Sequence, residues 1–269
     1  MTLLAIETAT DTVGVALLRD DGGVAERVHA GGRAHAELLA PSIEEVCAVS
    51  GCTVSDIDAI AVDVGPGLFT GLRVGVATAK ALAQALGIGV LGVGSLDVLA
   101  AAALEAASDG PTGGTGATAS VVDARRGEVF AAVFRFDPGP TRPDDPEQVR
   151  HDRLEPLAPE ALVDWLLTVA DESGSVSVVG DGAVRYRALL SEHRAFDLSL
   201  ADAGLAAPPP MALARLARRR LDRGMATVAP GEVVPDYRRP ADAQINWEQR
   251  PARPSANAPV GGPEQGRDR

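Results

Sequence analysis

The segment 63–75, with the sequence DVGPGLFTGLRVG, is the part of the chain best suited to hold an anion. An apolar run ends at Val64, a turn with Gly65 and Gly67 follows, and a helix is predicted to begin near Thr70. Backbone N–H groups at a strand end and at a helix N-terminus bind phosphate. The glycine spacing matches neither a P-loop nor the dinucleotide fingerprint. A tight strand–helix turn, in which glycine only supplies a positive φ, explains the segment equally well.

Acidic residues stand at the ends of two apolar runs. Glu7 follows the run 3–6, and Asp63 lies in the run 57–64. Glu7 with the hydroxyls after it resembles the phosphate-holding hairpin of actin-like kinases, where aspartate is usual. The extra methylene of glutamate would displace a metal-bound carboxylate by about one bond length. We interpret the acidic, hydroxyl and glycine residues of both segments as a degenerate phosphate site: Glu7, Thr8, Asp63, Gly65 and Gly67. A capping or turn role for the polar residues is the simpler alternative.

The helix predicted over 70–86 has a face of small residues. Gly71, Gly75 and Ala79 follow one another at four-residue spacing, which aligns them along one side of a helix. Glycine inside a helix costs roughly 1 kcal/mol relative to alanine, so we expect another backbone to come close to this face. The residues alone leave open whether that neighbour belongs to this chain or to a partner.

The other residues with catalytic potential form no recognisable constellation. No histidine lies four residues from another, so no metal-binding HxxxH pair exists among His29, His35, His151 and His193. Cys47 and Cys52 are the only cysteines, and we expect them to be reduced thiols. No Gly-x-Ser-x-Gly elbow is present. We therefore expect neither a metal site nor nucleophilic catalysis.

The composition is that of a globular protein with an acidic surface. Of 269 residues, 46% are apolar and 23% are charged, and the net charge is −12. This charge opposes autonomous binding of nucleic acid. The arginine-rich helix predicted over 211–223 is most simply a solvated face, with contact to RNA held by a partner as the lesser alternative. No run of eighteen apolar residues exists and the N-terminus lacks a basic region, so we expect a cytoplasmic protein without membrane contact.

Strands alternate with helices, which predicts an α/β fold. The expected strands lie at 3–6, 12–18, 24–29, 57–64, 88–93, 120–122, 128–136 and 175–179, and the expected helices at 35–49, 70–86, from 95, 159–169 and 208–222. The patterns of 5–18 and 122–134 match at an offset of 116 residues, which aligns Glu7 with Asp123 and indicates two related domains. We predict domains at 1–106 and 119–240, a linker at 107–118 and a disordered tail at 241–269, with helix 208–222 able to pack back on the first domain.

Taken together, several segments resemble the TsaB (YeaZ) family. They are LLAIETATDTVGVALL, AVDVGPGLFTGLRVGVATAKALA, GVGSLDVLA, VVDARRGEVFAAVF and PDYRRPA. In the last, Arg238 replaces the leucine of the family's Tyr-Leu-Arg pattern. The resemblance covers most of 1–240 and implies an actin-like (ASKHA, RNase H-like) tandem of two related α/β domains.

The resemblance also implies a role in modifying tRNA. Such proteins pair with the larger paralogue TsaD, which transfers threonylcarbamoyl to N6 of the tRNA adenosine at position 37, and the ATPase TsaE joins them. Ser95 and Leu99 stand where TsaD has its metal-binding histidines, which implies a non-catalytic subunit. No cofactor is then required, although a nucleotide at the TsaD interface is left open. We expect a homodimer when the protein is alone, and contact with tRNA only through the complex.

In the family, the first two helices form the surface that binds TsaD. The corresponding residues here are His35, Leu39, Ile43, Val46, Gly71, Leu72, Gly75 and Ala79. On this basis Gly75→Leu should abolish co-purification with TsaD and leave the monomer folded. The alternatives to this function are an active actin-like kinase or ATPase, an M22-type metallopeptidase, and a homodimer that needs no partner.

Overall fold

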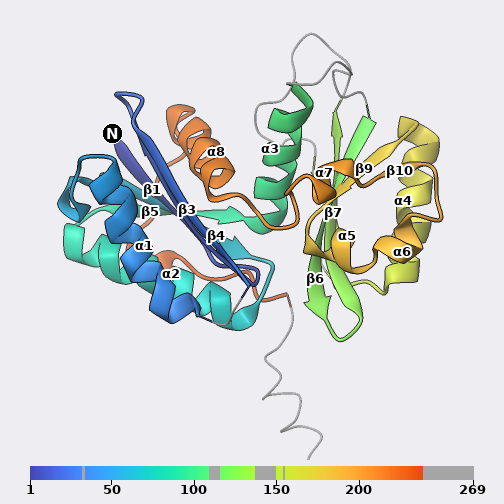
Figure 1. Ribbon diagram of the computed structural model, residues 1–269, viewed down its shortest axis with the longest axis horizontal. Coiled ribbons are helices and arrows are strands. Elements are labelled where there is room, and N and C mark those ends of the chain that lie inside the picture. Colours follow the sequence, from blue (N-terminus) through green and yellow to red (C-terminus); the bar gives the residue numbers. More distant parts are fainter. Residues whose placement is uncertain (32–33, 109–115, 137–149, 154, 239–269) are drawn as a thin grey trace, which may run out of the picture. The chain divides into compact units, whose positions relative to one another are not determined.

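The apolar runs of the sequence form two five-stranded mixed sheets (Figure 1). The computed structural model describes residues 1–31, 34–108, 116–136, 150–153 and 155–238. All of them belong to one unit, Met1–Arg239, in which each sheet with its helices forms a lobe. The predicted tail at 241–269 lies outside the described residues. Among the described helices, none is long and apolar enough to cross a bilayer.

The N-terminal lobe is built on a sheet with the order β3-β2-β1-β4-β5. Its strands are β1 (Thr2–Glu7), β2 (Thr12–Arg19), β3 (Val24–Ala30), β4 (Ala59–Gly65) and β5 (Gly89–Gly94). The first three strands pair antiparallel, whereas β4 and β5 continue from β1 in parallel. Parallel strands buried on both faces are near-continuous apolar runs, which is why β4 was recognisable in the sequence.

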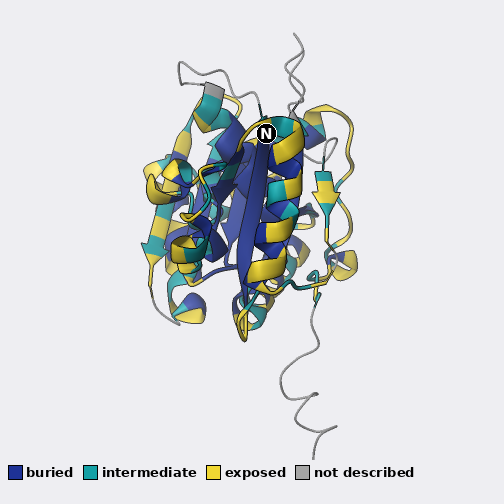
Figure 2. Cartoon of the chain, turned by 90° about the vertical axis from the view of Figure 1, so that its right-hand side faces the viewer, coloured by how far each residue is buried: buried dark blue, intermediate teal, exposed yellow. Residues whose placement is uncertain are grey.

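Helices cover both faces of this sheet. On one face lie α1 (His35–Val49) and α2 (Phe69–Leu86), and on the other α3 (Ser95–Ser108) and α8 (Pro210–Asp222). Successive residues of a strand point to opposite faces, so Leu4 and Ile6 pack under α1 and α2 whereas Leu3 and Ala5 pack under α3 and α8. The central strands β1 and β4 are buried, the edge strand β3 is largely exposed or half-buried, and the helices expose their outer sides (Figure 2). Helix α8 thus packs on the N-terminal sheet, although it follows the C-terminal one in sequence.

The C-terminal lobe repeats this topology with the strand order β10-β9-β6-β7-β8. Its strands are β6 (Gly116–Arg125), β7 (Glu128–Phe136), β8 (Arg150–Asp152), β9 (Val176–Val179) and β10 (Phe196–Asp197). Its helices are α4 (Pro159–Ser173), α5 (Asp181–Arg185), α6 (Arg187–Leu190) and α7 (Ser199–Asp202). The 3₁₀ turns η1 (Val54–Asp56) and η3 (Pro230–Glu232) instead contact α1 and α2 of the N-terminal lobe. Helix α3 also packs on this sheet, since Leu96 and Leu99 contact Phe134 and its neighbours.

The internal repeat predicted from the sequence is present in the strand order. In each sheet the first strand pairs antiparallel with the second strand and parallel with a later one: β1 with β2 and β4, and β6 with β7 and β9. Glu7 and Asp123 therefore occupy corresponding positions. The predicted linker at 107–118 was too long, because α3 continues to Ser108 and β6 begins at Gly116.

Candidate functional site

Glu7 and Asp63 form a buried acid pair at the ends of β1 and β4. The two strands are parallel neighbours with Ile6 opposite Val62, so the next residues lie side by side. Both acids are 0% exposed. The backbone N–H of Ala9 donates to Glu7 Oε1 over 2.8 Å, and Asp63 Oδ1 accepts from the Gly65 N–H at 2.7 Å.

A proton is expected to reside on Glu7. Burial raises the pKa of Glu7 well above its usual value, and the neighbouring Asp63 carboxylate adds to the rise. Burial also raises the pKa of Asp63, whereas hydrogen bonds to the acid oppose that rise. Glu7 Oε2 and Asp63 Oδ2 have no donor among the described residues. A protonated Glu7 donating to Asp63 would satisfy both oxygens, so the pair holds one negative charge rather than two.

The five residues assigned to a degenerate phosphate site do lie together, but their polar groups bond one another. The N–H groups of Ala9 and Gly65 are taken by the acid pair, and Thr8 Oγ1 donates to Gly71 O at 2.9 Å. A Cβ on Gly67 would lie 2.3 Å from Ala9 O, so this glycine is required by close packing. The Thr8 hydroxyl and the N–H groups of Ala9, Gly65 and Leu68 are therefore engaged within the chain and are not offered to a phosphate.

The eight residues predicted to face a partner are instead buried within the N-terminal lobe, so they do not lie on the exposed sides of α1 and α2. They are His35, Leu39, Ile43, Val46, Gly71, Leu72, Gly75 and Ala79. A Cβ on Gly71 would lie 2.0 Å from Thr8 O, and one on Gly75 would lie 2.2 Å from Thr8 Oγ1. We therefore expect Gly75→Leu to disturb the core, and no longer expect this variant to leave the monomer folded.

The opposite faces of α1 and α2 are exposed and rich in small residues. We call these residues the outer helix face: Ala36, Glu37, Ala40, Pro41, Glu44, Glu45, Ala48 and Val49 from α1, and Thr70, Arg73, Ala77, Ala81, Gln84 and Ala85 from α2. A pocket of about 720 Å³ opens where the two helices begin. Its lining includes His35, Val74 and, from the other lobe, Arg125. The sequence signal for this face was a second four-residue stripe, Ala77, Ala81 and Ala85.

The C-terminal lobe carries the corresponding acid pair, Asp123 and Asp181. The backbone N–H of Asp123 donates to Asp181 Oδ1 at 2.8 Å. Asp123 Oδ2 accepts from Arg125 at 3.1 Å and from Arg185 at 3.2 Å. Burial raises the pKa of Asp181 to about 6. Arg125 also bonds Asp11 of the first lobe at 3.0 Å, which connects the two lobes. Neither Asp181 nor these arginines were predicted as site residues from the sequence.

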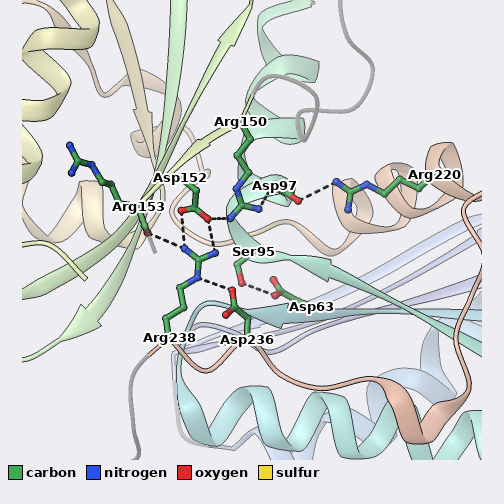
Figure 3. A network of polar contacts seen from close by, with 9 residues as sticks. All are labelled: Asp63, Ser95, Asp97, Arg150, Asp152, Arg153, Arg220, Asp236 and Arg238. Atoms are coloured by element: carbon green, nitrogen blue, oxygen red, sulfur yellow. Dashed lines mark hydrogen bonds and ion pairs between the residues drawn. The ribbon is translucent and has the colours of Figure 1, made fainter. Parts of the chain in front are cut away.

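A second chain of ion pairs joins the lobes through the C-terminal segment (Figure 3). Asp97, in the first turn of α3, accepts from Arg150 at 2.8 Å and from Arg220 of α8 at 3.1 Å. Arg150 also bonds Asp152, which in turn accepts both terminal nitrogens of Arg238 at 2.8 Å. Such fork-to-carboxylate pairing is geometrically specific. Arg238, the residue that departs from the family pattern, is thus the one that fastens this segment to the C-terminal lobe.

Ser95 and Leu99, which the family resemblance aligned with the metal-binding histidines of TsaD, make structural contacts in this fold. Ser95 Oγ donates to Asp63 Oδ1 at 2.6 Å, and Leu99 is fully buried between α3 and the C-terminal sheet. Within the described ranges, no three histidine, cysteine or acidic residues are placed to hold a metal ion.

The arginines of α8 pair with nearby acids. Glu105 of α3 forms ion pairs with Arg215 and Arg219, and Arg218 forms ion pairs with Asp20 and Asp222. These pairs favour the interpretation of a solvated helix face over contact with RNA.

Two sheets with the same strand order, each with an acid at the end of its first strand, define an actin-like tandem of α/β domains. A family model described as TsaD, tRNA N6-adenosine threonylcarbamoyltransferase, matches residues 11–247. The tRNA threonylcarbamoyladenosine biosynthesis protein TsaB of Bacillus subtilis is 30% identical over 92% of this chain and 98% of its own length. TsaB of Escherichia coli is 34% identical over 51% of this chain and 56% of its own length. The chain belongs to the TsaB family.

Solved structures agree with this assignment. YeaZ from Pseudomonas aeruginosa is 28% identical, with a TM-score of 0.64 over 87% of this chain and 98% of that one. A second structure, described as an uncharacterized protein with similarity to the peptidase YeaZ from the same organism, is 29% identical with a TM-score of 0.66 over 88% and 99% of the two chains. The fold expected from the resemblance is thereby confirmed.

Proposed function

We propose that this protein is a non-catalytic subunit of the machinery that makes threonylcarbamoyladenosine at position 37 of tRNA. The observation that carries the proposal is the full-length similarity to a TsaB named for this biosynthesis. The described contacts support the non-catalytic part, because the acids and N–H groups of the segments interpreted as a degenerate phosphate site bond one another, and Ser95 donates to Asp63. We propose TsaD as the partner that performs the transfer, with TsaE joining the pair and tRNA reached only through the complex.

We further propose that TsaD binds the outer helix face rather than the buried residues that the family resemblance implied. Alanines on both helices allow a second pair of helices to approach closely, because small side chains reduce the distance between helix axes. Thr70 and Arg73 add polar groups at one end, which suits the rim of an interface. The same face would form the interface of a homodimer when TsaD is absent. The pocket at the start of α1 and α2 borders it, so a nucleotide held between the subunits would lie beside Arg125.

The surface can be tested with Ala81→Arg, in the exposed stripe of α2, and a matched control, Ala161→Arg, on the exposed side of α4. A charged side chain at the centre of a close helix contact should weaken binding of TsaD from the same genome by 100-fold or more, on the order of 3 kcal/mol. The control should bind as the wild type does. Isothermal titration of each variant gives the affinities, and equal affinity of both variants would contradict this surface.

The function can be tested by reconstitution on unmodified tRNA with threonylcarbamoyl-adenylate as donor. The chain alone should leave the tRNA unmodified, TsaD alone should have little activity, and the full set of subunits should modify it. Modification by this chain in the absence of TsaD would overturn the proposal.

A further inference from the structure

Helix α1 ends in a Schellman motif, in which the backbone N–H of the sixth residue bonds the carbonyl of the first. Both of these residues are cysteines. The N–H of Cys52 donates to Cys47 O at 3.0 Å, and the N–H of Gly51 donates to Ala48 O at 3.1 Å. Gly51 has a φ of +65°, the left-handed conformation that this motif requires. In this motif the side chains of the first and sixth residues frequently contact each other, and here the two thiols are close enough for a side-chain hydrogen bond between them. The first is Cys47 and the sixth is Cys52.

The two thiols differ in their access to solvent. Cys47 is 2% exposed within the core under α1, whereas Cys52 is partly exposed and packs against the same core. Burial raises the pKa of Cys47 to about 11, with the nearby Cys52 thiol and the Asp56 carboxylate as further causes. Arg19, from β2, is the nearby cation, and it donates to Ser50 O at the same helix end at 2.7 Å. The outer thiol is therefore the one that meets a reagent first.

We propose that Cys47 and Cys52 form a reversible intramolecular disulfide on exposure to a small-molecule disulfide. The Cys52 thiolate attacks one sulfur of the reagent, which forms a mixed disulfide and releases the first thiolate. The Cys47 thiolate then attacks Cys52 Sγ, the mixed disulfide breaks, and the second reagent thiol leaves. Two protein thiols lose two electrons and two protons, and the reagent gains them. The product closes a covalent ring over the last turn of α1.

The geometry of the helix end favours the attack of Cys47 on Cys52 Sγ, whereas protonation of Cys47 slows it. The Schellman motif holds the two side chains near each other, which favours ring closure. Because Cys47 is protonated at neutral pH, its thiolate fraction should rise about tenfold for each pH unit between 7 and 9, and the rate of closure with it. The Asp56 carboxylate opposes formation of this thiolate, and Arg19 lies close enough to Asp56 to lower the pKa of that carboxyl.

The experiment incubates the full chain and two variants, Cys47→Ser and Cys52→Ser, with oxidised glutathione. Samples are quenched in acid, alkylated in denaturant and weighed by intact-mass spectrometry. The wild type should lose two hydrogens and resist alkylation. Cys47→Ser should retain one glutathione on Cys52, because no resolving thiol remains, whereas Cys52→Ser should stay unmodified while folded.

Two results would overturn the proposal. One is a wild type that accumulates the same stable glutathione adduct as Cys47→Ser, which would show that Cys47 cannot resolve it. The other is disulfide formation only after urea is added, which would show that the folded helix end does not bring the thiols together. Circular dichroism of both variants establishes that each is folded before the comparison is made.

Discussion

The two lobes place an acid pair at the same point of the same topology, yet the pairs have opposite surroundings. Glu7 and Asp63 are fully buried and accept only from neutral donors among the described contacts. Asp123 instead accepts from two arginines, whose side chains are about half exposed. One proton, expected on Glu7, lowers the charge of the first pair to −1, whereas two arginines offset the charge of Asp123.

This difference shows that a repeated strand pattern predicts where an acid lies but not which charge state it holds. The charge state of each carboxylate depends on the hydrogen-bond donors and charges that the following segments place around it. In the N-terminal lobe these are the turn at Gly65 and the first residue of α3, both of which offer neutral donors. In the C-terminal lobe the β6–β7 turn itself supplies Arg125, which adopts a positive φ of 63°. Such a backbone conformation is uncommon outside glycine, so the turn holds this arginine at a cost.

The largest effect should come from a bulky substitution at Gly75 of α2, which packs against the residue next to Glu7 of the N-terminal pair. Gly75→Leu places a side chain where a Cβ alone would lie 2.2 Å from Thr8 Oγ1, one residue from Glu7. We expect a loss of about 3 kcal/mol or more in unfolding free energy, because α2 must move away from the hairpin. Urea denaturation measures it, with Ala81→Leu on the exposed side of the same helix as control. Equal stability of the two variants would contradict the described packing.

A smaller loss should follow when the charge of the C-terminal pair is removed. Asp123→Asn keeps the size of the side chain and can still accept from the Arg125 N–H, but it weakens the two arginine contacts. We expect a destabilisation of about 1–2 kcal/mol at pH 8, which high salt reduces because the arginines are solvated. Urea denaturation at low and high salt is the measurement. A gain in stability would mean that the cations do not support Asp123.

Much of the fold was predictable because strand and helix periods are visible in the chain. The runs 3–6 and 57–64 are long enough and apolar enough to mark buried strands, and the repeated pattern of residues was sufficient to align Glu7 with Asp123. The arginine contacts were not predictable. Arg238 and Asp152 are 86 residues apart, and nothing in a local pattern indicates that two distant polar residues will meet.

The faces of α2 were assigned the wrong way round for a physical reason. The helix has small residues on both sides, Gly71, Gly75 and Ala79 inward and Ala77, Ala81 and Ala85 outward. Hydrophobic periodicity separates the two faces of a helix only when they differ in size or polarity. Here the decisive fact is that only glycine fits against Thr8, and that fact needs the position of the β1–β2 hairpin.

The smallest effect, and the one with the opposite sign, should come from Glu7→Gln. The raised pKa means that the folded chain binds more protons than the unfolded chain above the usual carboxyl value of 4.5, so wild-type stability falls as pH rises through the folded pKa. Each pH unit in that window costs up to about 1.4 kcal/mol for one proton. Glutamine cannot ionise and can still donate to Asp63, so the variant should lose this slope and gain about 1 kcal/mol over the wild type at pH 8. Urea denaturation from pH 5 to 8 tests both points.

Because Asp123→Asn should destabilise at the same pH, two conservative substitutions at corresponding strand ends should move stability in opposite directions. If both variants destabilise, the N-terminal pair does not hold a shared proton.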